Sequence, residues 1–284
     1  MEQTLRQAAA RLRDAGVVSA RVDAELLLAH AAGTNRAELQ RLALLGRRVP
    51  DSVLVAYGPL VDERARRVPL QHLTGTVSFA GLELAVGPGV FVPRPETELL
   101  VTLGVEALRG ADAPVVVDLC TGCGAVALAL KARVPGAEVL AVELSEHALA
   151  WAGENVARSG LEVGLRQGDA RTAGDDLLGT VDLVTCNPPY IPLGAVPVDP
   201  EVRDHDPELA LYGGSADGLA IPRAVAARAA VLLRPGGVLL MEHAEVQREA
   251  LTRALRSAGV WREVADHDDL TGRPRVARAV RAGG

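Results

Sequence analysis

This chain of 284 residues has few aromatic residues, few cysteines and no long apolar run. Aromatic side chains make up 2% of it, which leaves few rings for stacking against unpaired nucleic-acid bases. Three cysteines, an odd number, do not make a disulfide framework. No apolar run approaches the ~18 residues of a membrane span, and Met1-Glu2-Gln3 differs from the basic start of a signal peptide. We therefore expect a soluble, cytoplasmic protein without a membrane partner.

The pair Cys120-Thr-Gly-Cys123 has the spacing of some zinc and redox sites. A tetrahedral zinc site needs further ligands, and the sequence offers neither a second cysteine pair nor a nearby histidine. We expect no metal. Cys120, Cys123 and Cys186 all fall at the ends of predicted strands, so we interpret them as small residues beside a ligand.

The net charge is −6, which disfavours a protein whose main task is to grip a phosphate backbone. The charge is uneven, because residues 1–75 carry a net +3 and the other 209 residues carry −9. The amino-terminal part is therefore suited to an acidic or RNA-associated partner. Arginines on solvated helix faces would give the same pattern, and charge alone favours that simpler interpretation.

Residues 1–72 are interpreted as a small helical domain. Apolar residues recur there at helical spacing, and Gly16 and Gly33 follow the first two helical segments. Residues 73–94 are interpreted as a β-hairpin linker, because two short strand-like runs flank the break at Ala80-Gly81. The chain thus changes its hydrophobic period before a third, larger part begins.

Residues 95–284 alternate between strands and helices, which is typical of an α/β domain with a mainly parallel sheet. A β-branched run at 115–119 is followed by a turn at 120–124 and a helix at 125–133, an order that makes a nucleotide cradle. A helix is also expected at 96–108, and further strands at 139–143, 163–166, 181–186, within 233–241 and at 276–280.

Residues at three predicted strand ends suit a cofactor that contains a nucleoside. Gly122 and Gly124 let the backbone approach a ligand and expose amide groups at the start of a helix. Glu143, 19 residues after Gly124, can accept hydrogen bonds from both ribose hydroxyls. Asp169 follows the next predicted strand, where it could accept a hydrogen bond from an adenine amino group.

The loop Asn187-Pro188-Pro189-Tyr190 follows the apolar run 181–186, at the carboxyl end of a buried strand where open α/β sheets bind ligands. Its prolines lack amide hydrogens, which leaves the carbonyls of Asn187 and Pro188 free to accept other hydrogen bonds. Asn187 Oδ1 and the Pro188 carbonyl could hold the two hydrogens of a planar NH2 group, with Tyr190 against its flat face. Taken alone, a tight turn without chemistry explains the loop about as well.

Gly122 and Gly124 would also suit a nicotinamide dinucleotide, with Ala127 at the position of the usual third glycine. Hydride transfer needs an acid or a base, and no His, Lys or Tyr falls at a position that suggests one. S-Adenosyl-L-methionine has no pyrophosphate, so a turn with fewer glycines is compatible with it. These points favour a methyltransferase for an amide or an amine over a dehydrogenase.

Short motifs along nearly the whole chain resemble those of the HemK/PrmC protein-(glutamine-N5) methyltransferases. Asn-Pro-Pro-Tyr is shared with adenine-N6 DNA methyltransferases, whereas the Arg-Pro-Glu-Thr-Glu stretch is more specific. The motifs are Pro69-Leu-Gln-His-Leu-Thr-Gly75, Val92-Pro-Arg-Pro-Glu-Thr-Glu98, Asp118-Leu-Cys-Thr-Gly122, Asn187-Pro-Pro-Tyr-Ile191, Pro200-Glu-Val-Arg-Asp-His-Asp-Pro207, Asp217-Gly218-Leu219 and Glu242-His243.

This resemblance implies a Rossmann-like, seven-stranded S-adenosyl-L-methionine-dependent methyltransferase domain at 95–284, behind a helical domain that helps to dock the substrate. The implied reaction methylates N5 of the glutamine in the Gly-Gly-Gln motif of peptide-chain release factors. The implied catalytic residues are Asn187, Pro188 and Tyr190; the cofactor-binding residues are Asp118, Thr121, Gly122, Gly124, Glu143, Asp169 and Asn187; and the substrate-binding residues are Phe91, Pro189 and Tyr190.

Two residues depart from the family pattern. Glu143 stands where aspartate is usual, which keeps the carboxylate, and Cys123 stands where Ser or Thr is common, which removes a hydroxyl. Arg203, Asp204 and His205 either shape the substrate channel or belong to an ordinary polar loop, and the sequence favours neither interpretation.

The main alternative activity is that of an adenine-N6 nucleic-acid methyltransferase. The acidic catalytic part, the few aromatic residues and the lack of an inserted base-recognition domain disfavour it. A non-catalytic cofactor-binding protein is disfavoured by the intact Asn187 and Tyr190. We expect a monomer that does not bind DNA directly.

Overall fold

The computed structural model describes residues 1–283, which form two compact units. Unit 1 comprises Met1–Thr76 and Pro197–His205, and unit 2 comprises residues 77–196 and 206–283. The division expected from the sequence placed 197–205 in the methyltransferase part, whereas its contacts group it with the helices of the first unit.

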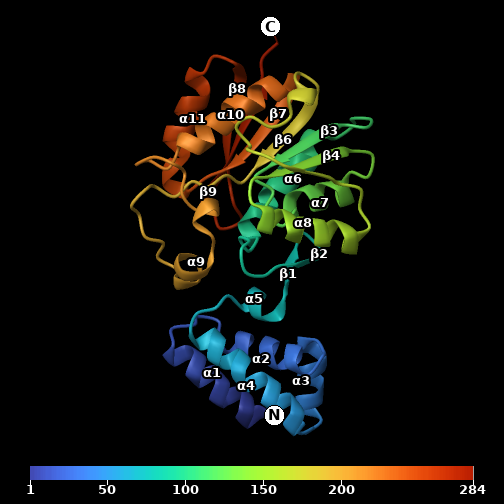
Figure 1. Cartoon of the computed structure of the whole chain (residues 1–284), viewed down its shortest axis with the longest axis vertical. Coiled ribbons are helices and arrows are strands. Elements are labelled where there is room, and N and C mark those ends of the chain that lie inside the picture. The colour runs from blue at the N-terminus through green and yellow to red at the C-terminus, as the bar shows by residue number, and fades with distance from the viewer. Residues whose placement is uncertain (284) are drawn as a thin grey trace. The chain divides into compact units, whose positions relative to one another are not determined.

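Unit 1 is a bundle of helices around one apolar core (Figure 1). The apolar stripe of the first helix, which includes Leu5 and Leu12, faces Leu27 and Leu28 of the second. The buried hydroxyl of Tyr57 donates to the carbonyl of Ala24 at 3.0 Å, so its polar end is satisfied inside the core. The helices are α1 (Glu2–Asp14), α2 (Ala20–Ala31), α3 (Arg36–Leu44), α4 (Asp51–Ala65), α5 (Leu70–Thr74) and α9 (Pro200–His205).

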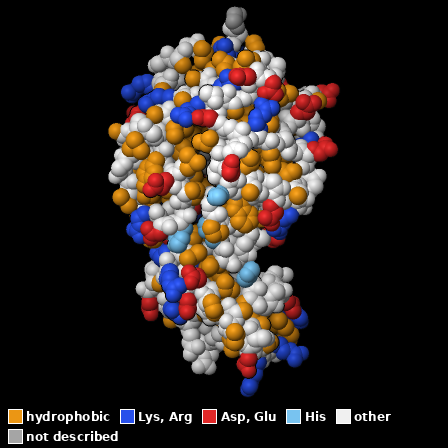
Figure 2. Space-filling view, in the orientation of Figure 1, with side chains coloured by type: hydrophobic (Ala, Val, Ile, Leu, Met, Phe, Trp, Pro, Cys, Tyr) orange, Lys and Arg blue, Asp and Glu red, His pale blue; other side chains and the backbone are white. Residues whose placement is uncertain are grey.

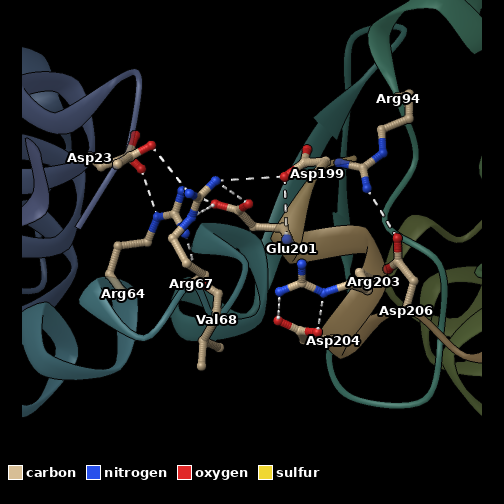
Figure 3. A network of polar contacts seen from close by, with 11 residues as sticks. Asp23, Arg64, Arg67, Val68, Arg94, Asp199, Glu201, Arg203, Asp204 and Asp206 are labelled. Carbon is tan, nitrogen blue, oxygen red and sulfur yellow. Dashed lines mark hydrogen bonds and ion pairs between the residues drawn. The ribbon is translucent and has the colours of Figure 1, made fainter. Parts of the chain in front are cut away.

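Ion pairs hold α9 in unit 1 (Figure 3). Glu201 is buried and accepts hydrogen bonds from Arg67 Nε and Arg64 Nη2, each at 2.7 Å. Arg64 is buried too, and its Nε donates to Asp23 Oδ2 at 2.8 Å. Burial alone would raise the pKa of Glu201, but the hydrogen bonds from both arginines outweigh it and lower the pKa. Residues 200–205 are therefore a helix anchored by charge, not a polar loop.

Unit 2 contains a hairpin and a seven-stranded sheet in the order β5-β4-β3-β6-β7-β9-β8 (Figure 1). The five strands from β5 to β7 run parallel, and β9 is antiparallel to both of its neighbours. This confirms the α/β fold and the seven strands that the resemblance implied. The strands are β1 (Thr76–Phe79) and β2 (Leu82–Ala85) of the hairpin, then β3 (Val115–Leu119), β4 (Glu138–Glu143), β5 (Gly164–Gln167), β6 (Val181–Cys186), β7 (Leu233–Glu242), β8 (Trp261–Asp268) and β9 (Pro274–Arg281).

Helices cover both faces of this sheet, and an apolar core lies on each side. One core contains residues of α6, α7 and α8, and the other contains residues of α10 and α11. The strand β8 and the helices α8, α10 and α11 were not located from the sequence. The helices are η1 (Pro95–Thr97), α6 (Glu98–Ala107), α7 (Ala125–Arg133), α8 (Glu146–Ser159), η2 (Asp175–Leu177), η3 (Glu208–Ala210), α10 (Ala220–Leu232), η4 (Glu245–Gln247) and α11 (Arg248–Ser257).

The chain order reverses in the sheet at β3, which pairs with β4 on one side and with β6 on the other. Ligands of open α/β sheets bind outside the carboxyl ends of the strands at such a point. Leu119 and Cys186 are register partners, so the turn after Leu119 and the loop after Cys186 leave the sheet side by side. We therefore expect the site at the carboxyl ends of β3 and β6.

Within residues 1–283, no helix is both long enough and apolar enough to cross a membrane. The same residues contain no group of three or more His, Cys, Asp or Glu side chains arranged to hold a metal ion. Acidic and basic side chains are interspersed on the face shown in Figure 2, rather than gathered in one broad patch of a single sign.

Glu201→Gln should lower the free energy of unfolding by about 1–3 kcal/mol near neutral pH, because buried Arg64 then has one carboxylate partner fewer. The folded-state pKa of Glu201 is lowered, so its contribution is present above the ordinary value of 4.5 and is lost as the pH falls below it. Urea unfolding followed by circular dichroism at neutral and at acidic pH would measure both effects.

Glu38→Gln is the matched control, because Glu38 forms an Arg–Glu pair with Arg41 that is exposed. It should change the free energy of unfolding by less than about 1 kcal/mol. Equal losses of unfolding free energy in the two variants would show that burial does not strengthen the ion pairs of Glu201.

Candidate active site

The turn after β3 has an unusual backbone that brings amide groups to the crevice. Cys120, Gly122 and Gly124 all have positive φ angles, of 59°, 59° and 84°. Glycine adopts this left-handed region freely, whereas at Cys120 it costs energy, as is common at ligand-binding turns. Gly124 is the residue that begins α7, so the turn leads directly into the amino terminus of a helix, as the sequence predicted.

Glu143 ends β4 beside this turn. Its Oε2 accepts a hydrogen bond from the Gly122 amide, and its Oε1 accepts one from the Ser145 amide, each at 2.9 Å. Each carboxylate oxygen has two lone pairs, so both can still accept a hydroxyl hydrogen. The carboxylate that was predicted to bind the ribose is therefore held rigidly at the edge of the crevice.

Asp118 is buried within β3 and braces the turn. Its carboxyl accepts from the hydroxyl of Thr121 in the turn at 2.6 Å and from that of Thr185 on β6 at 2.7 Å. Burial raises the pKa of Asp118 to about 6, although both hydroxyls favour the ionised form. These contacts brace the turn, and the predicted cofactor-binding roles of Asp118 and Thr121 stay predictions.

Asp169 lies after β5 and pairs with Arg171. The Arg171 Nε lies 2.9 and 3.0 Å from the two carboxylate oxygens, and this pairing lowers the pKa of Asp169. An adenine amino group would have to share this carboxylate with Arg171. The adenine-binding role of Asp169 stays a prediction.

The loop after β6 presents the two acceptors that the sequence predicted. Within residues 1–283, no donor bonds to Asn187 Oδ1 or to the carbonyl of Pro188. The other end of the Asn187 amide is engaged, because Nδ2 donates to Thr97 Oγ1 at 3.4 Å. The side chain is thus oriented with its oxygen available to a substrate.

Gln247 fixes the far end of this loop. Its Nε2 donates to the carbonyl of Tyr190 at 2.8 Å and to that of Asp217 at 2.8 Å. The neighbouring Gly218 is needed for space, because a Cβ there would lie 2.1 Å from the Tyr190 carbonyl oxygen. This packing explains the Asp217-Gly218 pair that the resemblance singled out.

Glu242, at the end of β7, contacts the hydroxyl of Tyr190. The Tyr190 hydroxyl donates to Glu242 Oε1 at 3.4 Å, and burial raises the pKa of Tyr190, so the hydroxyl keeps its proton. Burial also raises the pKa of Glu242, to about 7. Thr97, Glu242 and Gln247 were not identified as site residues from the sequence, although Thr97 and Glu242 lie within quoted motifs.

Phe91 and Pro189 were predicted to contact the substrate. Pro189 is buried in the loop, and the half-buried Phe91 ring lies 5.1 Å from the Arg94 guanidinium carbon. Arg94 Nη2 pairs in turn with Asp206 Oδ2 at 3.1 Å (Figure 3). This chain of contacts fixes the Phe91 ring, and its contact with a substrate stays a prediction.

Two family models match the chain. The PrmC N-terminal domain matches residues 3–75, and the methyltransferase small domain matches residues 82–196. These two matches cover nearly all of the helices of unit 1 apart from α9, together with β2 of the hairpin, the glycine turn and the Asn187 loop.

Similar proteins include the release factor glutamine methyltransferase of Streptomyces coelicolor, with 52% identity over 97% of this chain and 96% of that protein. A 4-amino-L-phenylalanine/4-methylamino-L-phenylalanine methyltransferase of Streptomyces pristinaespiralis is 42% identical over 92% of this chain and 89% of that protein. The T. thermophilus 16S rRNA N2 G1207 methyltransferase is similar in fold, with a TM-score of 0.54 and 23% identity over 72% of this chain and 49% of that one.

Glu143→Gln should weaken binding of S-adenosyl-L-methionine by about 10- to 100-fold, because a charge-assisted hydrogen bond contributes about 1.5–3 kcal/mol. Isothermal titration calorimetry would measure the change. Glu146→Gln alters an exposed carboxylate three residues away and should leave the affinity unchanged. An unchanged affinity of the Glu143→Gln variant for S-adenosyl-L-methionine would show that Glu143 does not bind the cofactor.

Proposed function

Because the chain belongs to the release factor glutamine methyltransferases, we propose that its Asn187 loop holds the side-chain amide of a release-factor glutamine for methylation. The protein is an S-adenosyl-L-methionine-dependent protein-glutamine methyltransferase. The proposed target is the glutamine of the Gly-Gly-Gln motif, and the proposed product carries the methyl group on N5.

One observation supports the proposed roles of the loop residues. Asn187 Oδ1 and the Pro188 carbonyl are two unengaged acceptors at the switch point of the sheet, beside the turn that ends at Gly124. A glutamine side chain offers two N–H donors in one plane, which matches two such acceptors. Tyr190 is held at both its carbonyl and its hydroxyl, so its ring provides a fixed wall for the planar amide.

The reaction is a direct transfer of the sulfonium methyl group to the amide nitrogen. That nitrogen is a poor nucleophile because its lone pair is delocalised into the carbonyl. The two acceptors pull on the N–H bonds, localise electron density on nitrogen and aim it at the methyl group. The N–C bond would form as the S–C bond breaks, the electron pair of that bond would stay on sulfur as a neutral thioether, and the nitrogen proton would pass to water after transfer, so no strong general base is required.

The proposed cofactor roles are supported by the position of these residues beside the glycine turn. Glu143 is proposed to bind the ribose hydroxyls, Gly122 and Gly124 to let the backbone approach the cofactor, and Asp169 to bind the adenine amino group. Asp118 and Thr121 keep the glycine turn in place.

Unit 1 is proposed to dock the release factor. The net positive charge of residues 1–75 suits a partner that works on RNA. Because release factors act in translation, we propose that the protein works in the cytoplasm. We also propose that it is a monomer that does not bind DNA directly.

Incubation with a purified release factor and S-adenosyl-L-methionine should add one methyl group to the glutamine of its Gly-Gly-Gln motif, as read by mass spectrometry. A release factor with Gln→Ala in that motif is the control. Free 4-amino-L-phenylalanine is a second candidate substrate to assay, because a 42% identical relative is named for it. Methylation of that amine alone, or of adenine in nucleic acid, would overturn the proposal.

Asn187→Ala should lower kcat by about 100- to 1000-fold while the cofactor dissociation constant changes little, because the lost acceptor acts on the amide and not on the cofactor. Initial rates with the release factor and calorimetry with the cofactor would separate the two. Comparable losses in turnover and in cofactor affinity would contradict this division of roles.

A further inference from the structure

A buried carboxyl lies behind the substrate loop, and the proposed mechanism does not use it. Glu242 is 1% exposed, and its Oε2 makes no hydrogen bond to any of residues 1–283. Oε1 accepts from the Tyr190 hydroxyl, and the hydroxyl of Thr97 also stabilises the ionised form of Glu242 as a hydrogen-bond donor. A buried carboxyl is costly to keep, so its place between two residues of the site needs an explanation.

The hydrogen bonds run in one direction from Asn187 to Glu242. Asn187 Nδ2 donates to Thr97 Oγ1, so the Thr97 oxygen acts as an acceptor in that bond. A hydroxyl has one hydrogen, so a Thr97 hydroxyl that accepts from Asn187 can direct its hydrogen toward the Glu242 carboxyl, which agrees with the effect of Thr97 in favouring the ionised form of Glu242. An ionised carboxyl can only accept, and it therefore fixes the direction of the whole chain.

Protonation of the carboxyl would remove this direction. A neutral Glu242 can donate to Thr97, whose hydroxyl can then donate to Asn187 Oδ1 instead of accepting from Nδ2. The Asn187 amide would turn over and present its NH2 group to the substrate. An NH2 group cannot accept a hydrogen bond from the glutamine amide, so the productive geometry would be lost.

We propose that ionised Glu242 is a positioning residue that, through Thr97 and Tyr190, keeps Asn187 Oδ1 turned toward the glutamine amide. Glu242 need not touch the substrate or the cofactor. This inference rests on the role proposed above for Asn187.

Four groups from three surrounding elements act on Glu242. Thr97 and Glu96 come from η1, Tyr190 from the loop after β6, and Arg275 from β9. Arg275 and the two hydroxyls favour the ionised form, while Glu96 opposes it. Burial outweighs them and raises the pKa to about 7, so the carboxyl loses its proton as the pH rises through neutrality. If the carboxylate is required, kcat must rise over the same interval.

Glu242→Gln is the test, because glutamine has a similar shape but can donate as well as accept. We expect kcat for the release factor to fall on the order of 10- to 100-fold, with the cofactor dissociation constant within about twofold of its original value. The rise of kcat through neutral pH should disappear in the variant. Glu245→Gln is the matched control, since Glu245 is exposed and lies three residues further along the chain.

If Glu242 only supported the fold, Glu242→Gln would lower the melting temperature. The proposal predicts no such loss. The folded-state pKa of Glu242 is raised, so its contribution to stability is lost as the pH rises from the ordinary value of 4.5 to about 7. Glu242→Gln removes this charge, and its melting temperature above neutral pH should be equal to or higher than that of the unchanged protein. A kcat within twofold of the original, or an unchanged pH profile, would overturn the proposal.

Thr97→Val provides a second measurement, because it removes the hydroxyl that accepts from Asn187 and that favours the ionised form of Glu242. It should lower kcat to a similar extent, and Glu242→Gln should have a much smaller effect when added to it. If the loss of kcat in the double variant equals the product of the losses in the two single variants, the two residues act independently. That result would overturn the proposal even if Glu242→Gln alone folds poorly. Full activity of Asn187→Ala would instead reject the proposed function on which the inference rests.

Discussion

The hydrogen bonding of the Asp118 carboxyl is the constraint on which the rest of the site depends. A carboxyl buried in a sheet must find partners, and Thr121 and Thr185 supply them within 2.7 Å. One partner lies in the glycine turn and the other on β6, the strand that ends at the Asn187 loop. The same side chain therefore holds the proposed cofactor and substrate segments in a fixed relation across the switch point.

Three carboxyls near the carboxyl ends of β3, β4 and β7 differ in burial and in their proposed tasks. Asp118 and Glu242 are buried, their pKa values are raised, and their partners belong to the protein. Glu143 is only partly buried, and two backbone amides orient it while its lone pairs stay available. A carboxyl that binds a ligand must be reachable and rigid, whereas one that orients other side chains has to be enclosed.

Local pattern was enough to predict most of the strands of unit 2, together with α6 and α7. A β-branched run, a glycine turn and a helix define β3 to α7, and an apolar run before two prolines placed Asn187 at the end of β6. The sequence did not show which partners the site residues choose. Gln247 bonds to Tyr190 across 57 positions, and Arg67 bonds to Glu201 across 134. Such contacts depend on tertiary packing, which hydrophobic periodicity does not encode.

Thr97 shows more clearly why the sequence alone does not reveal the partners of the site residues. It lies in the specific Arg-Pro-Glu-Thr-Glu stretch, yet its neighbours Pro95, Glu96 and Glu98 are all explained by the start of a helix. The contact of Thr97 with Asn187 reveals a second demand on this stretch. The motif therefore both starts a helix and orients the Asn187 side chain. Because helix initiation already accounts for the motif, the orienting role is not evident from the sequence.

An amide substrate explains why orientation dominates this site. A strong base would have to remove a proton from a group that barely ionises, whereas two fixed acceptors need only be aimed correctly. Asparagine is an ambiguous acceptor, because its two ends have nearly the same shape and opposite hydrogen-bonding capacity. A hydrogen-bond chain gains a direction only from a group that cannot donate, and a carboxylate meets that condition. The stability lost by burying Glu242 is then the consequence of giving Asn187 a single orientation.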